Sequence, residues 1–117
     1  MPLSTWDRAL ECTRSALDRK AYDLVVLETT ALTSIGDYFV ICSGRSDTQV
    51  QAIAEGVRDH LASLGVHPLA IEGLERGQWV LIDYGDVVVH VFDPAMREYY
   101  AVEDLWADAP RVDWERV

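Results

Sequence analysis

Two apolar runs separated by three residues constrain the fold of this chain more than any other feature. Segments 78–83 and 87–92 each have the length and the β-branched composition of a strand. Between them stands Tyr84-Gly85-Asp86, which is too short for anything but a tight turn. The sequence therefore predicts an antiparallel hairpin, and other parts of the chain must supply the layers that cover it.

Helical and strand patterns elsewhere predict those layers. Ser46 with Gln49 forms a capping box before an apolar stripe, and Gly65 stands where a helix ends. A helix between the second and third strands indicates a parallel crossover, so the sheet is expected to be mixed. The fold class is thus α/β, with a single mixed sheet of about five strands and flanking helices. The remaining elements are expected at residues 5–19 (helix), 23–28, 38–42 and 69–71 (strands) and 95–105 (helix).

Length and composition indicate one domain with a basic partner. The chain has 117 residues, half of them hydrophobic, and we expect a single domain over residues 1–110 with a short acidic tail at 111–117. Its net charge of −10 disfavours direct sequence-specific binding to nucleic acid and favours a basic protein surface. Cys12 and Cys42 lie outside any CxxC or Cys/His pattern, so we expect two buried reduced thiols and no zinc. With no apolar span or secretory signal, the expected location is the cytoplasm and not a membrane.

The two faces of the hairpin differ in character. Val87, Val89 and Val91 point to one face, which suits packing against a helix. The other face carries Trp79, Leu81, His90 and Phe92. Two interpretations of this second face stay open: either helices cover it, as in any layered α/β fold, or part of it is exposed and binds a partner.

Polar residues near the hairpin do not form a catalytic pattern. His90 is a lone histidine in a strand, and no Ser or Cys nucleophile is spaced to enlist it. Asp83 and Asp86 flank the turn, where aspartate side chains commonly bond nearby backbone, so we expect no metal. Segment 43–46 (SGRS) is interpreted as a turn and helix cap, because it lacks the glycines and lysine of a P-loop. The sequence therefore predicts no catalytic residue and no cofactor.

Several segments together resemble the Iojap-like proteins, also called the ribosomal silencing factor S family. They are 37–44 (DYFVICSG), 72–73 (EG), 79–92 (WVLIDYGDVVVHVF), 97–100 (REYY) and 105–106 (LW). The resemblance implies a nucleotidyltransferase-like fold without that superfamily's catalytic residues. It also implies a protein that binds ribosomal protein L-fourteen on the large ribosomal subunit and blocks joining of the small subunit. Translation would fall when nutrients are scarce, and isolated members would be homodimers.

The residues expected to contact the partner combine this resemblance with the aromatic face. They are Trp79, Asp83, Tyr84, His90, Glu98 and Tyr99. Large aromatic side chains would act as anchors and the acids would pair with Lys or Arg. Because side chains alternate along a strand, Tyr84 can lie on the opposite face from Trp79. Two alternatives remain: a nucleotide-binding or nucleotidyltransferase-like enzyme, and a homodimeric adaptor that uses its aromatic face for self-association.

Overall fold

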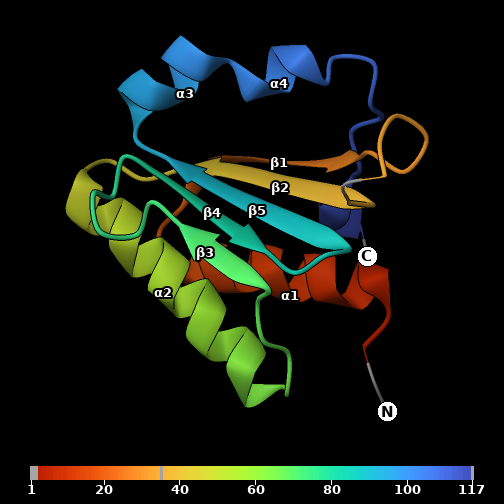
Figure 1. The fold of residues 1–117 in the computed structure, drawn as a ribbon, viewed down its shortest axis with the longest axis horizontal. Helices are drawn as coiled ribbons and strands as arrows, with labels where there is room; N and C mark the ends of the chain where they lie inside the picture. Colours follow the sequence, from red (N-terminus) through yellow and green to blue (C-terminus); the bar gives the residue numbers. More distant parts are fainter. Residues whose placement is uncertain (1–2, 35, 117) are drawn as a thin grey trace.

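The computed structural model of the chain describes residues 3–34 and 36–116 and has three layers (Figure 1). Two long helices lie below a five-stranded sheet, and two short helices lie above it. None of the described helices is long and apolar enough to cross a membrane. The elements in chain order are α1 (Thr5–Asp18), β1 (Tyr22–Glu28), β2 (Tyr38–Ser43), α2 (Asp47–Ser63), β3 (Ala70–Glu72), β4 (Trp79–Asp83), β5 (Val87–Phe92), α3 (Pro94–Tyr100), α4 (Val102–Leu105) and a 3₁₀ turn η1 (Trp114–Arg116).

The sheet confirms the predicted hairpin and the mixed topology. Its strand order is β1-β2-β5-β4-β3, with β4 and β5 antiparallel and β2 parallel to β5. Because β3 is antiparallel to β4, it runs in the same direction as β2. The connection through α2 therefore joins parallel strands, as predicted, but β5 and β4 fill the space between them. The fold class expected from the sequence, a single mixed sheet of five strands with flanking helices, is correct.

The lower face of the sheet forms the main core. Val87, Val89 and Val91 are buried there against α1 and α2, as their alternation predicted. Cys12 and Cys42 are free and buried in the same core. Burial raises the pKa of both thiols, that of Cys42 to about 12, so neither ionises near neutral pH.

The capping box predicted for α2 is only half formed. Ser46 Oγ accepts from the backbone N–H of Gln49 at 3.1 Å, as expected. The Gln49 side chain does not return to Ser46; its amide nitrogen instead donates to the carbonyl oxygen of Arg19 at 2.5 Å. The glutamine thus fastens the start of α2 to the end of α1, because that carbonyl is left without an intrahelical partner.

The single helix expected over residues 95–105 is wrong, since the structure has two. Ala101 has a φ of +46°, which is left-handed and stops the helix after Tyr100. The Ala101 N–H donates to the carbonyl oxygen of Arg97, as at the end of many helices. The chain then turns into α4, where Val102 is buried against the sheet. Nothing in the composition marked this break, because alanine normally favours a helix interior.

The segment after Pro110 is part of the fold over its described residues. The N–H of Glu28 donates to the Pro110 carbonyl oxygen at 2.9 Å, and the N–H of Val112 donates to the Val26 carbonyl oxygen at 2.8 Å. These bonds cover the outer edge of β1, which would otherwise offer unpaired backbone groups. Val112 and Trp114 also pack against the main core.

Candidate protein-binding surface

The upper face of the sheet is covered over one part and open over another. Above β2 and β5, helices α3 and α4 close over a second hydrophobic cluster. Above β4 the cover stops, and Trp79 and Leu81 are only partly buried. The cover expected by the first interpretation is thus present above β2 and β5, and the exposure expected by the second is present above β4. The buried residues of this upper cluster are Leu27, Phe39, Ile41, Val88, Phe92, Val102 and Ala109.

Aromatic rings continue from the open part of the sheet onto α3. The Trp79 ring stacks on Phe92 with 5.0 Å between centroids and lies 4.7 Å from Tyr100. Tyr100 in turn meets Tyr99 edge to face at 5.0 Å. Tyr99 is 79% exposed and Tyr100 is 46% exposed. We call Trp79, Leu81, Tyr99 and Tyr100 the aromatic surface.

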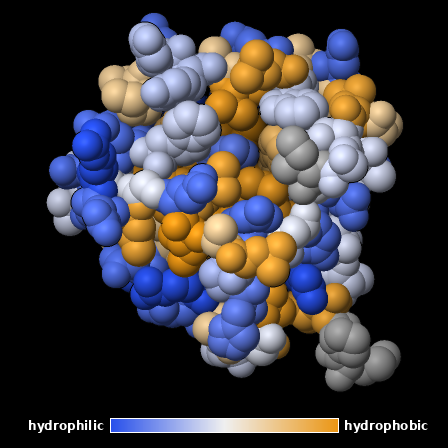
Figure 2. Space-filling model, in the orientation of Figure 1, coloured by the Kyte–Doolittle hydropathy of each residue, from blue (hydrophilic) through white to orange (hydrophobic). Residues whose placement is uncertain are grey.

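Acidic side chains border the aromatic surface. On the upper face of β4, Asp83 follows Leu81, and the cross-strand neighbour of Leu81 on β3 is Glu72. Glu72 is exposed, and so is Glu98, which precedes Tyr99 on α3. Figure 2 shows several hydrophobic patches on the side of the molecule turned to the viewer, divided and bordered by hydrophilic residues. An apolar centre with a charged rim is the usual anatomy of a protein interface.

His90 lies beneath the aromatic surface and is not part of it. Its side chain is 5% exposed and packs near Phe39, with ring centroids 5.2 Å apart. The indole N–H of Trp79 donates to His90 Nδ1 at 3.2 Å. Burial lowers the pKa of His90 to about 4, so the ring is neutral near pH 7 and Nδ1 can accept. A direct contact between His90 and a partner is therefore not available in this conformation.

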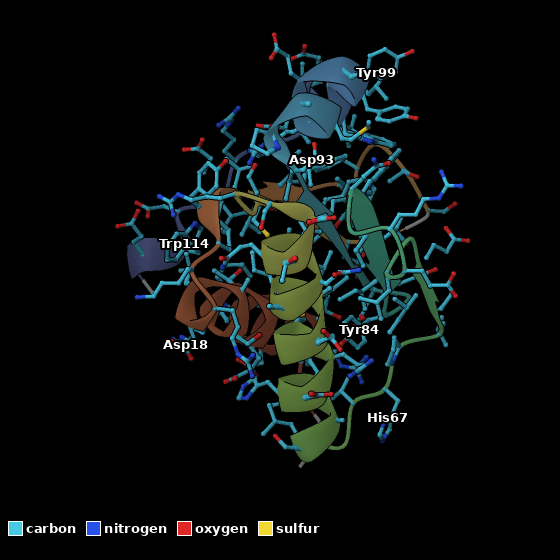
Figure 3. All side chains as sticks on the ribbon, turned by 90° about the vertical axis from the view of Figure 1, so that its left-hand side faces the viewer. Asp18, His67, Tyr84, Asp93, Tyr99 and Trp114 are labelled. Atoms are coloured by element: carbon cyan, nitrogen blue, oxygen red, sulfur yellow. The ribbon has the colours of Figure 1, made fainter. Side chains whose placement is uncertain are left out.

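Tyr84 is separated from the other predicted contact residues by the sheet. It is 5% exposed and packs in the lower core, and Figure 3 shows it beside α2 while Tyr99 stands on the outer side of α3. Burial raises the pKa of its hydroxyl, which has no hydrogen-bond partner among the described residues. The structure thus links His90, Trp79 and Tyr99 through ring contacts that include Tyr100, and it leaves Tyr84 on the far side. Asp83 lies further along the same face of β4, and Glu98 lines the pocket beside Arg97.

The acids of the hairpin have structural partners. Asp83 Oδ1 accepts from the N–H of Gly85 at 2.7 Å, which closes the turn. Asp86 accepts from the Thr5 hydroxyl at 3.0 Å and forms an ion pair with Arg8 at 3.4 Å, tying the hairpin to α1. Over residues 3–34 and 36–116, no group of three or more His, Cys, Asp or Glu side chains is placed to hold a metal ion.

A family model described as "Ribosomal silencing factor during starvation" matches residues 2–117. The chain belongs to this family. It is similar to the ribosomal silencing factor RsfS of Bacillus subtilis, with 46% identity over 96 residues that cover 82% of this chain and 81% of the relative. It is also similar to RsfS of Halalkalibacterium halodurans, with 47% identity and 86% of each chain covered. The resemblance predicted from the sequence segments is confirmed.

A solved structure agrees with this membership of the silencing-factor family. The crystal structure of a protein from Chromobacterium violaceum superposes with a TM-score of 0.88 at 39% sequence identity. The match covers 90% of this chain and 88% of that one. This chain thus shares its fold with a solved structure at clear sequence similarity.

Two residues of the family-like segments have structural roles that the sequence did not predict. Gly73, at the end of β3, has a φ of +83°, and a Cβ there would overlap the carbonyl oxygen of Trp79. The Glu72-Gly73 pair therefore lets the loop after β3 lie directly against the start of β4. The signal was present in the sequence, because a glycine after a short strand often marks a close backbone approach.

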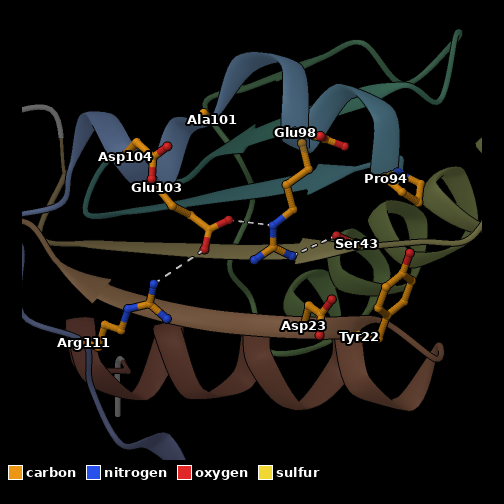
Figure 4. A pocket seen from close by; sticks show the side chains of 10 residues that line it. Tyr22, Asp23, Ser43, Pro94, Glu98, Ala101, Glu103, Asp104 and Arg111 are labelled. Carbon is orange, nitrogen blue, oxygen red and sulfur yellow. Dashed lines mark hydrogen bonds and ion pairs between the residues drawn. The ribbon is translucent and has the colours of Figure 1, made fainter.

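Arg97 is the second missed residue. Its side chain extends from α3 and lines a pocket of about 390 Å³, which is shown in Figure 4. Its guanidinium donates to Ser43 Oγ at 2.8 Å and to Glu103 at 2.7 Å, and Glu103 also pairs with Arg111 at 3.8 Å. Arg97 thereby fixes α3 to the end of β2 and to α4. A basic residue among the acids of the 97–104 segment was the available signal.

Proposed function

We propose that this chain binds the large ribosomal subunit through ribosomal protein L-fourteen and thereby keeps the small subunit from joining. In this proposal it acts in the cytoplasm and lowers translation when nutrients are scarce. The observation that carries the proposal is the exposed aromatic surface with its acidic rim, on a chain of the silencing-factor family.

The chemistry of the surface suits a basic protein partner. Trp79 and Tyr99 offer large rings of the kind that dominate interface energetics. Glu72 lies beside Leu81, where it can pair with Lys or Arg, and the exposed Glu98 next to Tyr99 in the sequence adds negative charge that speeds the encounter. The whole chain carries −10, so its field also favours a basic target. Blocking a subunit needs only volume in the right place, and an interface of about 1,600 Å² would hold it there.

The contact residues proposed from the sequence take different places in this interface. Trp79, Glu98 and Tyr99 would touch the partner directly. Asp83 would contribute at the rim with the oxygen that the Gly85 N–H does not use. His90 would act through Trp79, and Tyr84 has no place in the interface because it is buried on the opposite face.

A second use of the same surface is self-association. An aromatic surface left open to water favours pairing with a second copy, and a two-fold interface needs only one self-complementary patch. We propose that the isolated chain is a homodimer through this surface. Tyr99→Ala would then give a monomer in analytical ultracentrifugation; a variant that stays dimeric would place the dimer contact elsewhere.

The nucleotidyltransferase alternative gains no support from the hairpin. Paired carboxylates that hold a divalent metal are the basis of that chemistry. Asp83 closes the turn and Asp86 binds α1, while the residue two before Asp83 on the same face is Leu81. A clear heat of binding on titration with ATP and magnesium would nevertheless restore this alternative.

The experiment that tests the proposal is sedimentation of separated ribosomal subunits through a sucrose gradient. We expect the wild-type chain to reduce the peak of joined ribosomes and to travel with the large subunit. Trp79→Ala should do neither. Leu64→Ala is a matched control, because Leu64 is a partly exposed apolar residue at the end of α2, on the opposite layer. Unchanged joining with saturating wild-type chain would overturn the proposal.

A further inference from the structure

Trp79 is held from three directions although its indole is part of the open surface. Phe92 stacks beneath it, Tyr100 lies beside it, and His90 accepts its N–H. The first two contacts are ring packing, which constrains the orientation of the indole less strictly than a hydrogen bond does. The hydrogen bond to His90 is directional and selects one orientation of the indole.

The hydrogen bond determines which nitrogen of His90 carries the proton. A neutral imidazole has one N–H and one acceptor, so Nδ1 can accept from Trp79 only when the proton is on Nε2. The Nε2 atom is buried and has no hydrogen-bond partner among the described residues. A buried donor without a partner costs stability. For the fold alone, an apolar side chain at position 90 would be at least as good, since Phe39, Ile41 and Leu81 surround it.

We propose that His90 is a positioning residue for partner binding, which holds the Trp79 indole in the orientation that the partner recognises. This inference rests on the proposed docking function of the aromatic surface. In this proposal His90 does not touch the partner. It orders the Trp79 side chain before binding, so that less conformational entropy is lost when the partner binds. Ordering one large side chain at an interface corresponds to an affinity change of about three- to ten-fold.

Asparagine and leucine at position 90 form a matched test. The two side chains have nearly the same shape, and Asn Oδ1 takes the place of His Nδ1 as an acceptor, while leucine has none. We expect His90→Asn to bind the large subunit within about two-fold of wild type and His90→Leu to bind about three- to ten-fold more weakly. We expect the opposite order in stability, with His90→Leu unfolding at a higher urea concentration than His90→Asn. A purely structural role would make binding and stability change together.

Two further measurements keep this inference distinct from the proposed function. The indole N–H resonance of Trp79, assigned by its loss in Trp79→Phe, should exchange slowly with solvent in wild type and His90→Asn and rapidly in His90→Leu. This readout needs no partner. In the Trp79→Phe background, which lacks the donor, His90→Leu should cause no further loss of binding.

Failure of the proposed function and failure of the positioning role of His90 give different results. If the wild-type chain does not bind the large subunit, the proposed function fails, and the indole exchange rates still decide whether His90 holds Trp79. If the wild type binds and His90→Leu binds equally well, the positioning role is wrong. Equal indole exchange in all variants would also overturn it.

Discussion

The guanidinium of Arg97 donates to the hydroxyl of Ser43 at 2.8 Å, and this bond fastens α3 to the end of β2. Ser43 is buried and the Arg97 side chain is only 15% exposed. Since α3 has no buried residue of its own, it depends on such contacts for its place above the sheet. The position of Tyr99 and Tyr100 therefore depends on the polar contacts of Arg97 as much as on packing.

Removal of the Arg97 side-chain hydrogen bonds is expected to destabilise the fold. Arg97→Met keeps most of the aliphatic length but loses the bonds to Ser43 and Glu103, and the free energy of unfolding should fall by about 1.5–3 kcal/mol. Urea denaturation measures the change. Arg58→Met is the control, because Arg58 pairs with exposed acids on α2 and its loss should cost less than about 0.5 kcal/mol. Equal effects of the two variants would show that the hydrogen bonds of Arg97 do not stabilise the fold.

Tyr99→Ala should separate binding from stability. Tyr99 is 79% exposed, so its truncation should change the free energy of unfolding of the monomer by less than about 0.5 kcal/mol. As a central aromatic residue of the proposed interface it should cost about 2 kcal/mol of binding, which is roughly a thirty-fold weaker affinity for the large subunit. Biolayer interferometry with immobilised subunits would measure it. Binding within two-fold of wild type would remove Tyr99 from the interface.

The sequence was sufficient for most of the fold because its signals are local. The alternation over residues 78–92 specified a hairpin, and the faces it assigned to Val89 and His90 are the observed ones. Strand order was harder: β5 enters between β2 and β4, a long-range pairing that no local pattern encodes. The break at Ala101 also escaped prediction, because tertiary contacts overrode the helix propensity of alanine.

The geometry of the candidate surface was not predictable from the sequence. Trp79 and Tyr99 were among the expected contact residues, and both reach the surface. Their contact runs through Tyr100, which only the packing of α3 on the sheet reveals. Burial of His90 depended likewise on the packing of Phe39 and Trp79 around it. The alternation of side chains along the strand indicated that Tyr84 can lie on the opposite face from Trp79. It did not show which face would be open.

Acid should weaken the fold through His90. Its pKa in the folded chain is about 4, below the ordinary value of 6.5, so the unfolded chain binds the proton more readily. Stability from this group is complete above pH 6.5 and is lost as the pH falls towards 4. The loss should reach about 2 to 3 kcal/mol near pH 4.5, as measured by urea denaturation at several pH values.

His90→Leu supplies the control for this pH effect. Carboxylates titrate in the same range in both chains, so the difference between wild type and His90→Leu isolates the histidine. The variant should lose less stability than the wild type between pH 6.5 and 4.5. Parallel stability curves for the two chains over this range would contradict the expected titration.

Glycine at position 101 should stabilise the chain. Ala101 adopts a left-handed backbone with a φ of +46°, a conformation that strains its Cβ and that glycine adopts freely. Ala101→Gly should therefore raise the free energy of unfolding by about 0.5–1 kcal/mol, part of the gain being offset by the greater freedom of unfolded glycine. Gly65→Ala is the mirror control, because Gly65 has a φ of +80° with open space around it, so the same strain should lower stability by about 1 kcal/mol. Chemical denaturation measures the free energy of unfolding of both variants. A loss of stability in Ala101→Gly would show that the Cβ of Ala101 contributes more by packing than it costs in strain.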